Sequence, residues 1–201
     1  MQQTKGRPRG FDRDEALSAA MRLFWERGYE ATSIGELTRV MGISPPSLYA
    51  AFGDKETLFR ESVAAYGQTP FGAFVAIAIS QEPTARAAIT RILNGAAEQY
   101  TDPTHPRGCL TICSATNLTP ANNHIGVYLR NLRADTTGLL EARFGLAVKE
   151  GELAADTDTV ALANWFALVI QGMSQRSCDG ASFEDLHDAA RLAMLAWPKT
   201  R

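Results

Sequence analysis

Apolar positions along this chain recur mainly at spacings of three and four residues. Such spacing gathers apolar side chains on one face of an α-helix, whereas a β-strand requires apolar and polar residues to alternate. Segments with helical spacing follow one another from residue 12 to residue 197, and none shows sustained alternation. The pattern therefore predicts an all-α protein of about nine helices.

The first 67 residues contain four predicted helices with clear start and stop signals. Each begins after a residue whose side chain can accept a hydrogen bond from the first turn, and each is followed by a glycine. The predicted N-caps are Asp12, Ser33, Ser44 and Asp54, and the terminal glycines are Gly28, Gly42, Gly53 and Gly67. Further helices are predicted at 67–81 (with a break), 84–100, 109–117, 121–149, 157–175 and 182–197.

The second and third predicted helices are short and are separated by Gly42-Ile43-Ser44. This arrangement is typical of a helix-turn-helix, in which the second helix points its N-terminal residues at base edges in the major groove. The segment 45–52 is too short to be stable alone, and its small side chains can approach bases closely. A purely structural hairpin has the same pattern, so these residues alone leave both interpretations open.

Residues with phosphate-binding character surround this pair of helices. Thr32 with Ser33, and Asp54 with Lys55, stand at predicted helix N-termini, where backbone N–H groups bind anions. Tyr49 can offer its phenol to a phosphate, although packing is the commoner role for such a residue. The sequence thus groups several candidate DNA contacts around one short helix.

The net charge of -2 argues against a polycation that coats nucleic acid, but it says nothing about local patches. The segment 1–11 contains Lys5, Arg7 and Arg9 and no acid. Basic arms of this kind follow the DNA backbone or enter the minor groove, and they also occur as solvated tails.

The composition, with 45% hydrophobic residues, is sufficient for a folded core. The most apolar run, 71–79, is too short to cross a bilayer, and no secretory signal pattern opens the chain. The three cysteines do not form a disulfide-framework pattern. We therefore expect a cytoplasmic protein with no membrane partner.

Residues from about Gly6 to Tyr66 closely resemble the DNA-binding domain of TetR-family transcriptional regulators. The resemblance rests on the segments GRPRG, FWERGYEATSI, MGISPPSLYAAF and GDKE, which follow one another in the family's order. It implies a DNA-binding domain at 1–67, with the helix-turn-helix at about 33–52, and an effector-binding and dimerisation domain at 68–201. It also implies a homodimeric repressor that an unknown small-molecule effector releases from a palindromic operator in double-stranded DNA.

The resemblance further implies individual contacts with DNA. The implied phosphate contacts are Thr32, Ser33, Tyr49 and Lys55, and the residues implied to face the bases are Ser44, Pro45, Pro46 and Ser47.

The remainder of the chain gives a weaker signal for the effector site. The residues that could line a pocket are Phe71, Phe74, Cys109, Cys113, Tyr128, Asn164, Trp165 and Gln171. Cys109, Cys113 and the nearby His105 are too few for a metal ligand set, so we predict no metal site and no cofactor. The two cysteines most simply line the pocket as small apolar residues, and thiol-based redox sensing through them is an alternative.

Two apolar stripes near the C-terminus predict a pair of packed helices. The stripes are Leu162, Phe166, Val169, Ile170 and Met173, and Leu186, Ala190, Ala193, Met194 and Trp197. Such a pair can form a four-helix interface across a two-fold axis or an internal core. The family resemblance favours the interface.

Other classes of function have little support. No nucleophile elbow, phosphate-binding glycine loop, HExxH motif or telling carboxylate pair is present, so we do not expect an enzyme. A non-DNA adaptor that retains only the scaffold is the remaining alternative, alongside a small helical enzyme without a motif. We expect the fourth helix, 54–67, to connect the DNA-binding and effector parts, because it begins at the motif and ends at the body.

Overall fold

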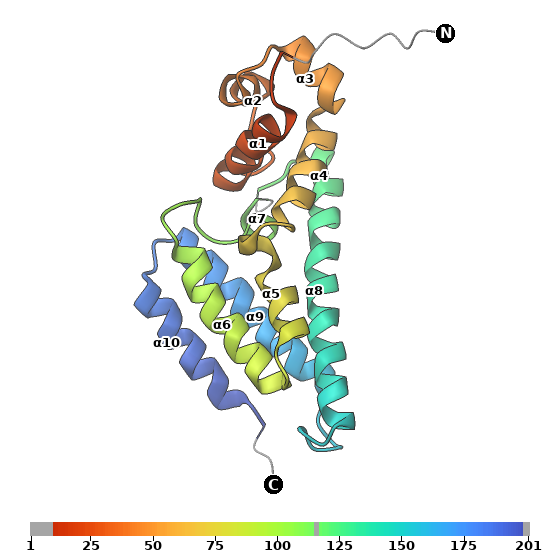
Figure 1. The fold of residues 1–201 in the computed structure, drawn as a ribbon, viewed down its shortest axis with the longest axis vertical. Helices are drawn as coiled ribbons and strands as arrows, with labels where there is room; N and C mark the ends of the chain where they lie inside the picture. The colour runs from red at the N-terminus through yellow and green to blue at the C-terminus, as the bar shows by residue number, and fades with distance from the viewer. Residues whose placement is uncertain (1–9, 115–116, 199–201) are drawn as a thin grey trace, which may run out of the picture.

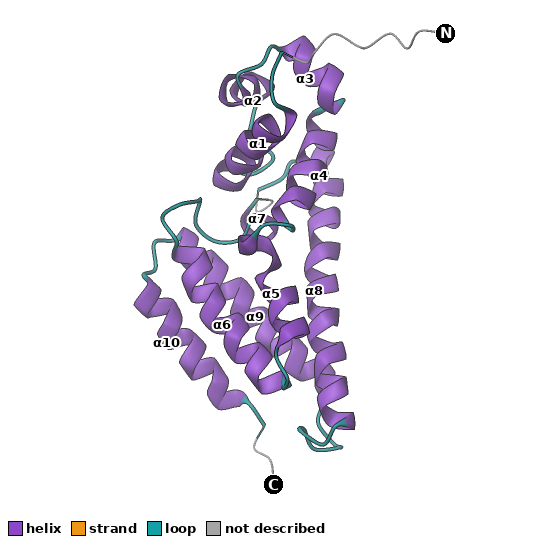
Figure 2. Cartoon of the chain, viewed as in Figure 1, coloured by secondary structure: helices purple, strands orange, loops and turns teal. Residues whose placement is uncertain are grey.

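Residues 10–114 and 117–198 are described in this computed structural model, and every described element is helical (Figure 2). The helices are α1 (Arg13–Arg27), α2 (Ile34–Met41), α3 (Pro45–Phe52), α4 (Lys55–Tyr66), α5 (Pro70–Gln81), α6 (Ala85–Thr101), α7 (Leu110–Cys113), α8 (Asn123–Lys149), α9 (Thr159–Cys178) and α10 (Phe183–Ala193). Short 3-10 turns lie at Pro120–Asn122 and Met194–Ala196. The predicted all-α fold is confirmed, and the described residues contain ten α-helices.

The molecule is elongated, with α1, α2 and α3 at one end (Figure 1). We call α1 to α4 the head and α5 to α10 the body. The helix α4 leads from the head into the body beside the long helix α8, and α7 lies where the two parts meet (Figure 1). Buried apolar residues form one cluster that continues through both parts, so no flexible linker separates them.

All four predicted N-caps are confirmed in the head. Each side chain accepts a hydrogen bond from the first turn of its helix: Asp12 from Asp14, Ser33 from Glu36, Ser44 from Ser47, and Asp54 from Thr57. Gly28, Gly42 and Gly53 have positive φ angles, as expected for residues that end helices. Gly67 differs, because its φ is -61° and the chain turns there directly towards α5.

Three predicted helix boundaries are wrong. The predicted break within 67–81 is absent, because Thr69 caps α5 and the helix runs unbroken from Pro70 to Gln81. In the predicted helix 109–117 the structure has a single turn, α7, and the Ser114 carbonyl after it accepts a hydrogen bond from the head. Residues 115 and 116 of this prediction lie outside the described residues. The predicted helix 121–149 begins with a 3-10 turn before α8.

The two C-terminal apolar stripes mostly form the internal core. Phe166 of α9, Phe144 of α8 and Trp197 pack together with ring centroids 5.7 to 6.1 Å apart. Leu186 and Ala190 of α10 are also buried within the same chain. The interpretation of these stripes as an internal core is therefore correct, and any dimer surface must use other faces of these helices.

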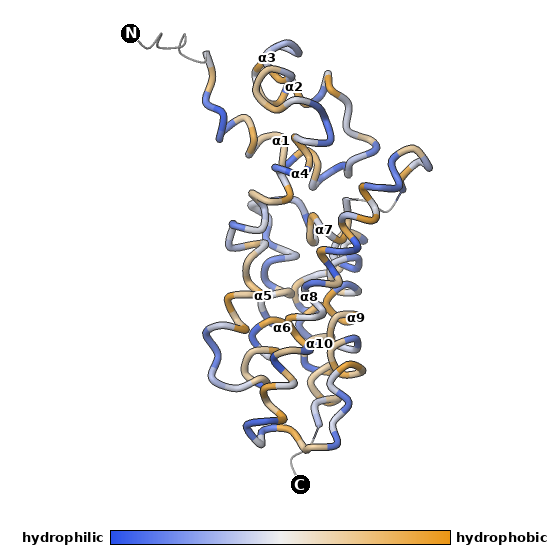
Figure 3. The backbone as a smooth tube through the Cα atoms, turned by 90° about the vertical axis from the view of Figure 1, so that its right-hand side faces the viewer, coloured by the Kyte–Doolittle hydropathy of each residue, from blue (hydrophilic) through white to orange (hydrophobic). Residues whose placement is uncertain are grey.

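Polar and apolar residues are interspersed along the helices of both parts (Figure 3). No single described helix has the length and hydropathy needed to cross a membrane. Only α4 and α5 taken together reach those limits, and a 47° bend separates them.

Candidate nucleic-acid interface and internal cavity

The helix α3 lies at the tip of the head (Figure 1), and its side chains form one buried and one exposed face. Leu48 and Phe52 anchor it, with 0% and 2% of their surface exposed. Pro45, Pro46 and Tyr49 are exposed, and Tyr49 keeps 50% of its surface accessible. This arrangement presents the first turn of α3 outwards, as the major-groove interpretation requires.

The start of α3 is fixed by a pair of hydroxyl groups. The Ser44 Oγ accepts a hydrogen bond from the Ser47 backbone N–H at 3.3 Å, and the two Oγ atoms lie 2.9 Å apart. A shallow cavity of about 360 Å³ lies between these serines and Gly10 and Phe11. The arm residues Lys5, Arg7 and Arg9 precede this point and lie outside the described residues.

The structure presents the predicted phosphate contacts in different ways. Ser33 is exposed at the start of α2, and the ammonium group of Lys55 lies 4.3 Å above the ring of Tyr29. Partial burial lowers the pKa of Lys55. Thr32 is 1% exposed and donates its hydroxyl to the Gly28 carbonyl at 2.7 Å, so its side chain stabilises the α1–α2 turn. The Thr32 hydroxyl is thus used within the head, and the implied contact of Thr32 with a phosphate stays a prediction.

One exposed cation of the head was missed in the sequence. Arg39 lies in the last turn of α2, and none of the ion pairs in the described part of the chain includes it. Other cations of the head are paired within it: Arg13 with Glu61, Arg27 with Glu36, and Arg60 with Glu56. The sequence signal that could have identified Arg39 as a candidate DNA contact is its position as a basic residue in the first helix of the helix-turn-helix.

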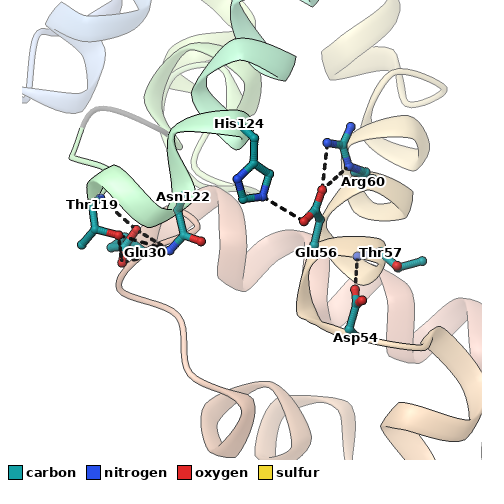
Figure 4. A network of polar contacts seen from close by, with 8 residues as sticks. All are labelled: Glu30, Asp54, Glu56, Thr57, Arg60, Thr119, Asn122 and His124. Atoms are coloured by element: carbon teal, nitrogen blue, oxygen red, sulfur yellow. Dashed lines mark hydrogen bonds and ion pairs between the residues drawn. The ribbon is translucent and has the colours of Figure 1, made fainter.

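A polar network joins the head to the start of α8 (Figure 4). The Glu30 carboxylate accepts hydrogen bonds from Asn122 Nδ2 at 3.0 Å and from the Thr119 backbone N–H at 3.2 Å. These bonds, that of Asn122 foremost, lower the pKa of Glu30. The α1–α2 turn is thereby fixed to the segment that precedes α8.

The same network includes the first turns of α4 and α8 (Figure 4). The Glu56 carboxylate lies 2.9 Å from His124 Nε2 and accepts a hydrogen bond from Arg60 Nε at 2.9 Å. The hydrogen bond from Arg60, followed by that of His124, lowers the pKa of Glu56. The guanidinium of Arg60 also lies 4.3 Å above the ring of Tyr128 on α8. These contacts join the start of α8 directly to α4.

The end of α1 contacts the segment around α7. Trp25 Nε1 donates to the Gly108 carbonyl at 3.2 Å, and the Tyr29 N–H donates to the Ser114 carbonyl at 2.9 Å. Gly28 has a φ of 78°, and a Cβ there would lie 2.9 Å from the Ser114 oxygen. The close approach of α1 to Ser114 thus requires glycine at position 28.

A cavity of about 460 Å³ lies in the body, next to the region where the head and the body meet. Its wall is formed by residues of α4, α5, α6, α7, α8 and α9 and is largely apolar and aromatic. The Tyr66 hydroxyl donates to Cys109 Sγ at 3.4 Å, and Arg133 donates to the Thr111 carbonyl at 2.6 Å. Burial raises the pKa of Tyr66 and lowers that of Arg133. An apolar chamber with a few polar groups is typical of a small-molecule site.

The predicted pocket residues divide into two groups. Those that line the cavity are Phe74, Cys109, Tyr128 and Gln171, and those that do not are Phe71, Cys113, Asn164 and Trp165. Phe71 packs against the ring of His105, with centroids 4.2 Å apart, and Cys113 faces a separate cavity. Asn164 and Trp165 are exposed to solvent. The residues of α9 that line the cavity begin at Ala167. These four residues therefore lie outside the wall of this cavity.

A larger groove of about 810 Å³ runs along α5 and α6. It is more open than the internal cavity, and several charged side chains line it: Glu82, Arg86, Arg91 and Glu98. The internal cavity, although smaller, is the better enclosed site for an organic ligand.

Comparisons with known proteins agree with this geometry. A sequence model described as "Bacterial regulatory proteins, tetR family" matches residues 16–62, which extend from α1 into α4. The HTH-type transcriptional repressor ComR of Escherichia coli (strain K12) is 34% identical over 199 residues, which cover 99% of this chain and 95% of ComR. The repressor BdcR of the same organism is 30% identical over 188 residues, which cover 94% of this chain and 90% of BdcR.

A solved structure also resembles the whole chain. It contains a cysteine mutant of the TetR family transcriptional regulator CifR complexed with 26bp double-strand operator DNA. The identity is 40%, the TM-score is 0.92, and the match covers 96% of this chain and 100% of that one. These relatives are regulators of transcription rather than enzymes. The chain belongs to the TetR family of transcriptional regulators.

Proposed function

We propose that this chain is a homodimeric repressor that binds a palindromic operator through α3 and is released when a small molecule enters the internal cavity. The observation that carries the DNA-binding part is the orientation of α3, with Leu48 and Phe52 buried and its N-terminal turn exposed. ComR and BdcR are described as repressors, and CifR was crystallised with operator DNA, which supports the same role here.

The proposed DNA contacts surround α3. Pro45, Pro46 and Ser47 face the bases, with Ser44 fixing their position through its cap. Phosphate contacts come from Ser33, Tyr49, Lys55 and Arg39, and from the arm residues Lys5, Arg7 and Arg9. We take residues 1–67 as the DNA-binding domain and 68–201 as the effector and dimer domain, in a protein of the cytoplasm.

The proposed dimer surface is centred on the outward face of α9. Leu168 and Val160 expose 67% and 51% of their surface, and Trp165 lies between them in the helix. Exposed apolar residues also occur on the neighbouring helices, namely Leu139 and Leu146 on α8, Leu192 on α10, and Leu195. Exposed apolar side chains on a helical body are typical of a surface that a second copy covers.

The chemistry of the cavity suggests an effector class. Aromatic and aliphatic side chains form most of the wall, so the ligand is predominantly apolar. Arg133 is partly buried at this wall and has guanidinium N–H groups beyond the one that bonds the Thr111 carbonyl. We propose a molecule with an apolar body and a carboxylate or carbonyl group that accepts hydrogen bonds from Arg133.

Release follows from contacts shared by the cavity and the junction. Tyr128 lines the cavity, and the guanidinium of Arg60 on α4 lies over the face of its ring. A ligand that shifts Tyr128 moves α8 and, through Arg60 and Glu56, the head. The ligand must bind the released state more tightly by the free energy of the shift that it causes.

Selection from a random pool of DNA duplexes tests the DNA-binding part. We expect enriched palindromes whose half-sites lie on one face of the duplex, separated by about one helical turn or a multiple of it. The matched control is the same selection with a Tyr49→Ala, Lys55→Glu double variant, which should enrich nothing. Equal enrichment by both proteins would refute the role of α3.

Thermal unfolding with a series of aliphatic carboxylates, and the alcohols of equal chain length, tests the effector class. We expect carboxylates of suitable length to raise the Tm of the wild type more than the alcohols do. Arg133→Met should remove this preference while keeping the apolar contribution. Equal shifts for both series would contradict the proposed role of Arg133.

A further inference from the structure

Two cysteines distant in the sequence meet beneath the end of α1. Cys113 is the last residue of α7, Cys178 is the last residue of α9, and their Sγ atoms lie 2.9 Å apart. Both are free thiols in the structure. Cys178 is exposed and Cys113 is partly exposed, and both line a cavity of about 460 Å³ that is separate from the effector chamber. A small oxidant therefore has access to the pair.

The surrounding chain is adapted to keep the two thiols together. The backbone of Gly108 passes beside them with a φ of 71°, and a Cβ there would lie 2.7 Å from Cys178 Sγ and 2.9 Å from Cys113 Sγ. The Ser174 Oγ lies 3.3 Å from Cys113 Sγ and accepts a hydrogen bond from the Cys109 N–H at 2.9 Å. Position 108 thus requires glycine both for its backbone conformation and for the space that the thiols occupy.

The third cysteine is placed differently. The Sγ of Cys109 accepts a hydrogen bond from the Tyr66 hydroxyl at 3.4 Å and lies 3.2 Å from Thr111 Oγ1, towards the effector cavity. The sequence suggested Cys109 and Cys113 as the redox pair, but the structure brings Cys113 to Cys178 instead. The spacing of four residues along the chain gave no indication of this long-range contact.

We propose that Cys113 and Cys178 are a reversible oxidation site and that a hydroperoxide joins them in an intramolecular disulfide. The Cys113 thiolate attacks one peroxide oxygen, the O–O bond breaks, and the leaving oxygen takes up a proton and departs as water or an alcohol. The sulfur of Cys178 then attacks the resulting sulfenic acid, an S–S bond forms, and the hydroxyl leaves as water with the proton of Cys178. The two thiols lose two electrons and the hydroperoxide gains them.

The electrostatics of the pair support this order of events. Hydrogen bonding, that of Cys178 foremost and then that of Ser174, lowers the pKa of Cys113 to about 6, so it is largely thiolate near neutral pH. The same contact raises the pKa of Cys178, which keeps its proton. A thiolate beside a protonated thiol is the arrangement that the first step requires.

The residue next to Cys113 joins the site to the DNA-binding head. Ser114 follows Cys113 directly, and its carbonyl accepts the hydrogen bond from the Tyr29 N–H at the end of α1. A bond between Cys113 and Cys178 moves the end of α7 towards α9 and changes this contact. Oxidation therefore alters the support of the head from a position outside the effector cavity.

Peptide mapping of the intact protein tests the site without any need for DNA binding. The reduced protein is treated with hydrogen peroxide, its free thiols are blocked, and it is digested with trypsin without reductant. We expect a cross-link between the peptides 108–130 and 177–191, whose fragmentation assigns it to Cys113. The Cys109→Ser variant should form the same cross-link, and Cys178→Ser should lose it. Stable sulfinic acid without a cross-link, or a cross-link only between two copies, would overturn the proposal.

Hydrogen exchange at the Tyr29 amide tests the connection to the head. We expect exchange in the oxidised protein to be faster by about threefold or more, because displacement of Ser114 weakens its hydrogen bond. The Cys178→Ser variant treated with the same peroxide is the matched control and should show no change. Unaltered exchange in protein that is fully cross-linked would refute the connection between the thiol pair and the head.

Discussion

The exposed face of α3 and the internal cavity are both proposed binding sites, yet they are built in opposite ways. The α3 site comes from one short stretch of sequence, with its cap, its two buried anchors and its outward residues within nine positions, 44–52. The cavity wall comes from six helices, between Val63 and Gln171. The first site is therefore a property of local sequence, while the second depends on how the whole body packs.

The largest effect is expected from variants that change only the DNA-binding site around α3. Tyr49→Ala combined with Lys55→Glu removes an exposed phenol and reverses a cation fixed over Tyr29, and we expect a loss of operator affinity of about 100-fold or more. The measurement is fluorescence anisotropy with the selected operator at a stated salt concentration. Arg86→Glu, an equal charge reversal on the exposed side of α6, is the control and should bind nearly as well as the wild type.

A slightly smaller effect is expected when the body is altered without touching either site. Leu168→Glu places a charge on the apolar face of α9, where 67% of the leucine surface is exposed, so it should convert the dimer to monomers in sedimentation experiments. Operator affinity should fall by about tenfold or more, because a monomer binds only one of the two half-sites of the operator. Val127→Glu on α8 is the comparison variant. An unchanged dimer in Leu168→Glu would show that another face associates.

The connection between the two sites can be weakened while both remain intact. Glu56→Gln removes the charge that both His124 and Arg60 contact. The groups are largely exposed, so the free energy of unfolding should fall by less than about 1 kcal/mol. Ligand binding should persist while the ligand-induced loss of operator affinity decreases several-fold. Release as complete as in the wild type would mean that the signal travels by a different route.

The smallest effect concerns acid stability at the junction. The pKa values of Glu30 and Glu56 are lowered in the folded protein, so their hydrogen bonds stabilise it above the ordinary carboxyl pKa of 4.5. This contribution is lost as the pH falls from about 4.5 through the lowered values of the folded state. Circular dichroism between pH 6 and pH 3 should show a shallower loss of stability in Glu30→Gln than in the wild type. Parallel curves would exclude a contribution from Glu30.

The α3 site, which comes from one short stretch of sequence, was easier to predict than the cavity, which six helices form. The caps at Ser33, Ser44 and Asp54 were predictable because each depends on residues within three positions. The burial of Thr32 was not, because its hydroxyl is used by the Gly28 carbonyl. The single turn of α7 was also missed, since its end is determined by the Tyr29 N–H from the head.

Half of the predicted pocket residues line the internal cavity, for a related reason. Aromatic residues in a helical body, such as Phe74 and Tyr128, can be recognised from the sequence as candidates for a pocket wall. Asn164 and Trp165 share α9 with the cavity residue Gln171, and only the three-dimensional position of the chamber separates them. The contact between Cys113 and Cys178 spans 65 positions and has no local signature at all.

The length of α8 matters for the proposed release. Its 27 residues span about 40 Å, so a tilt of only about 5° displaces one end relative to the other by about 3.5 Å. Tyr128 and Arg133 meet the cavity close to the end that carries His124, and the far end is held by the body. Because the cavity contacts and the head contacts lie at the same end of α8, a tilt about the far end displaces both by similar amounts. In the proposed release, a small movement of the cavity wall would therefore reach α4 through a rigid helix without being lost on the way.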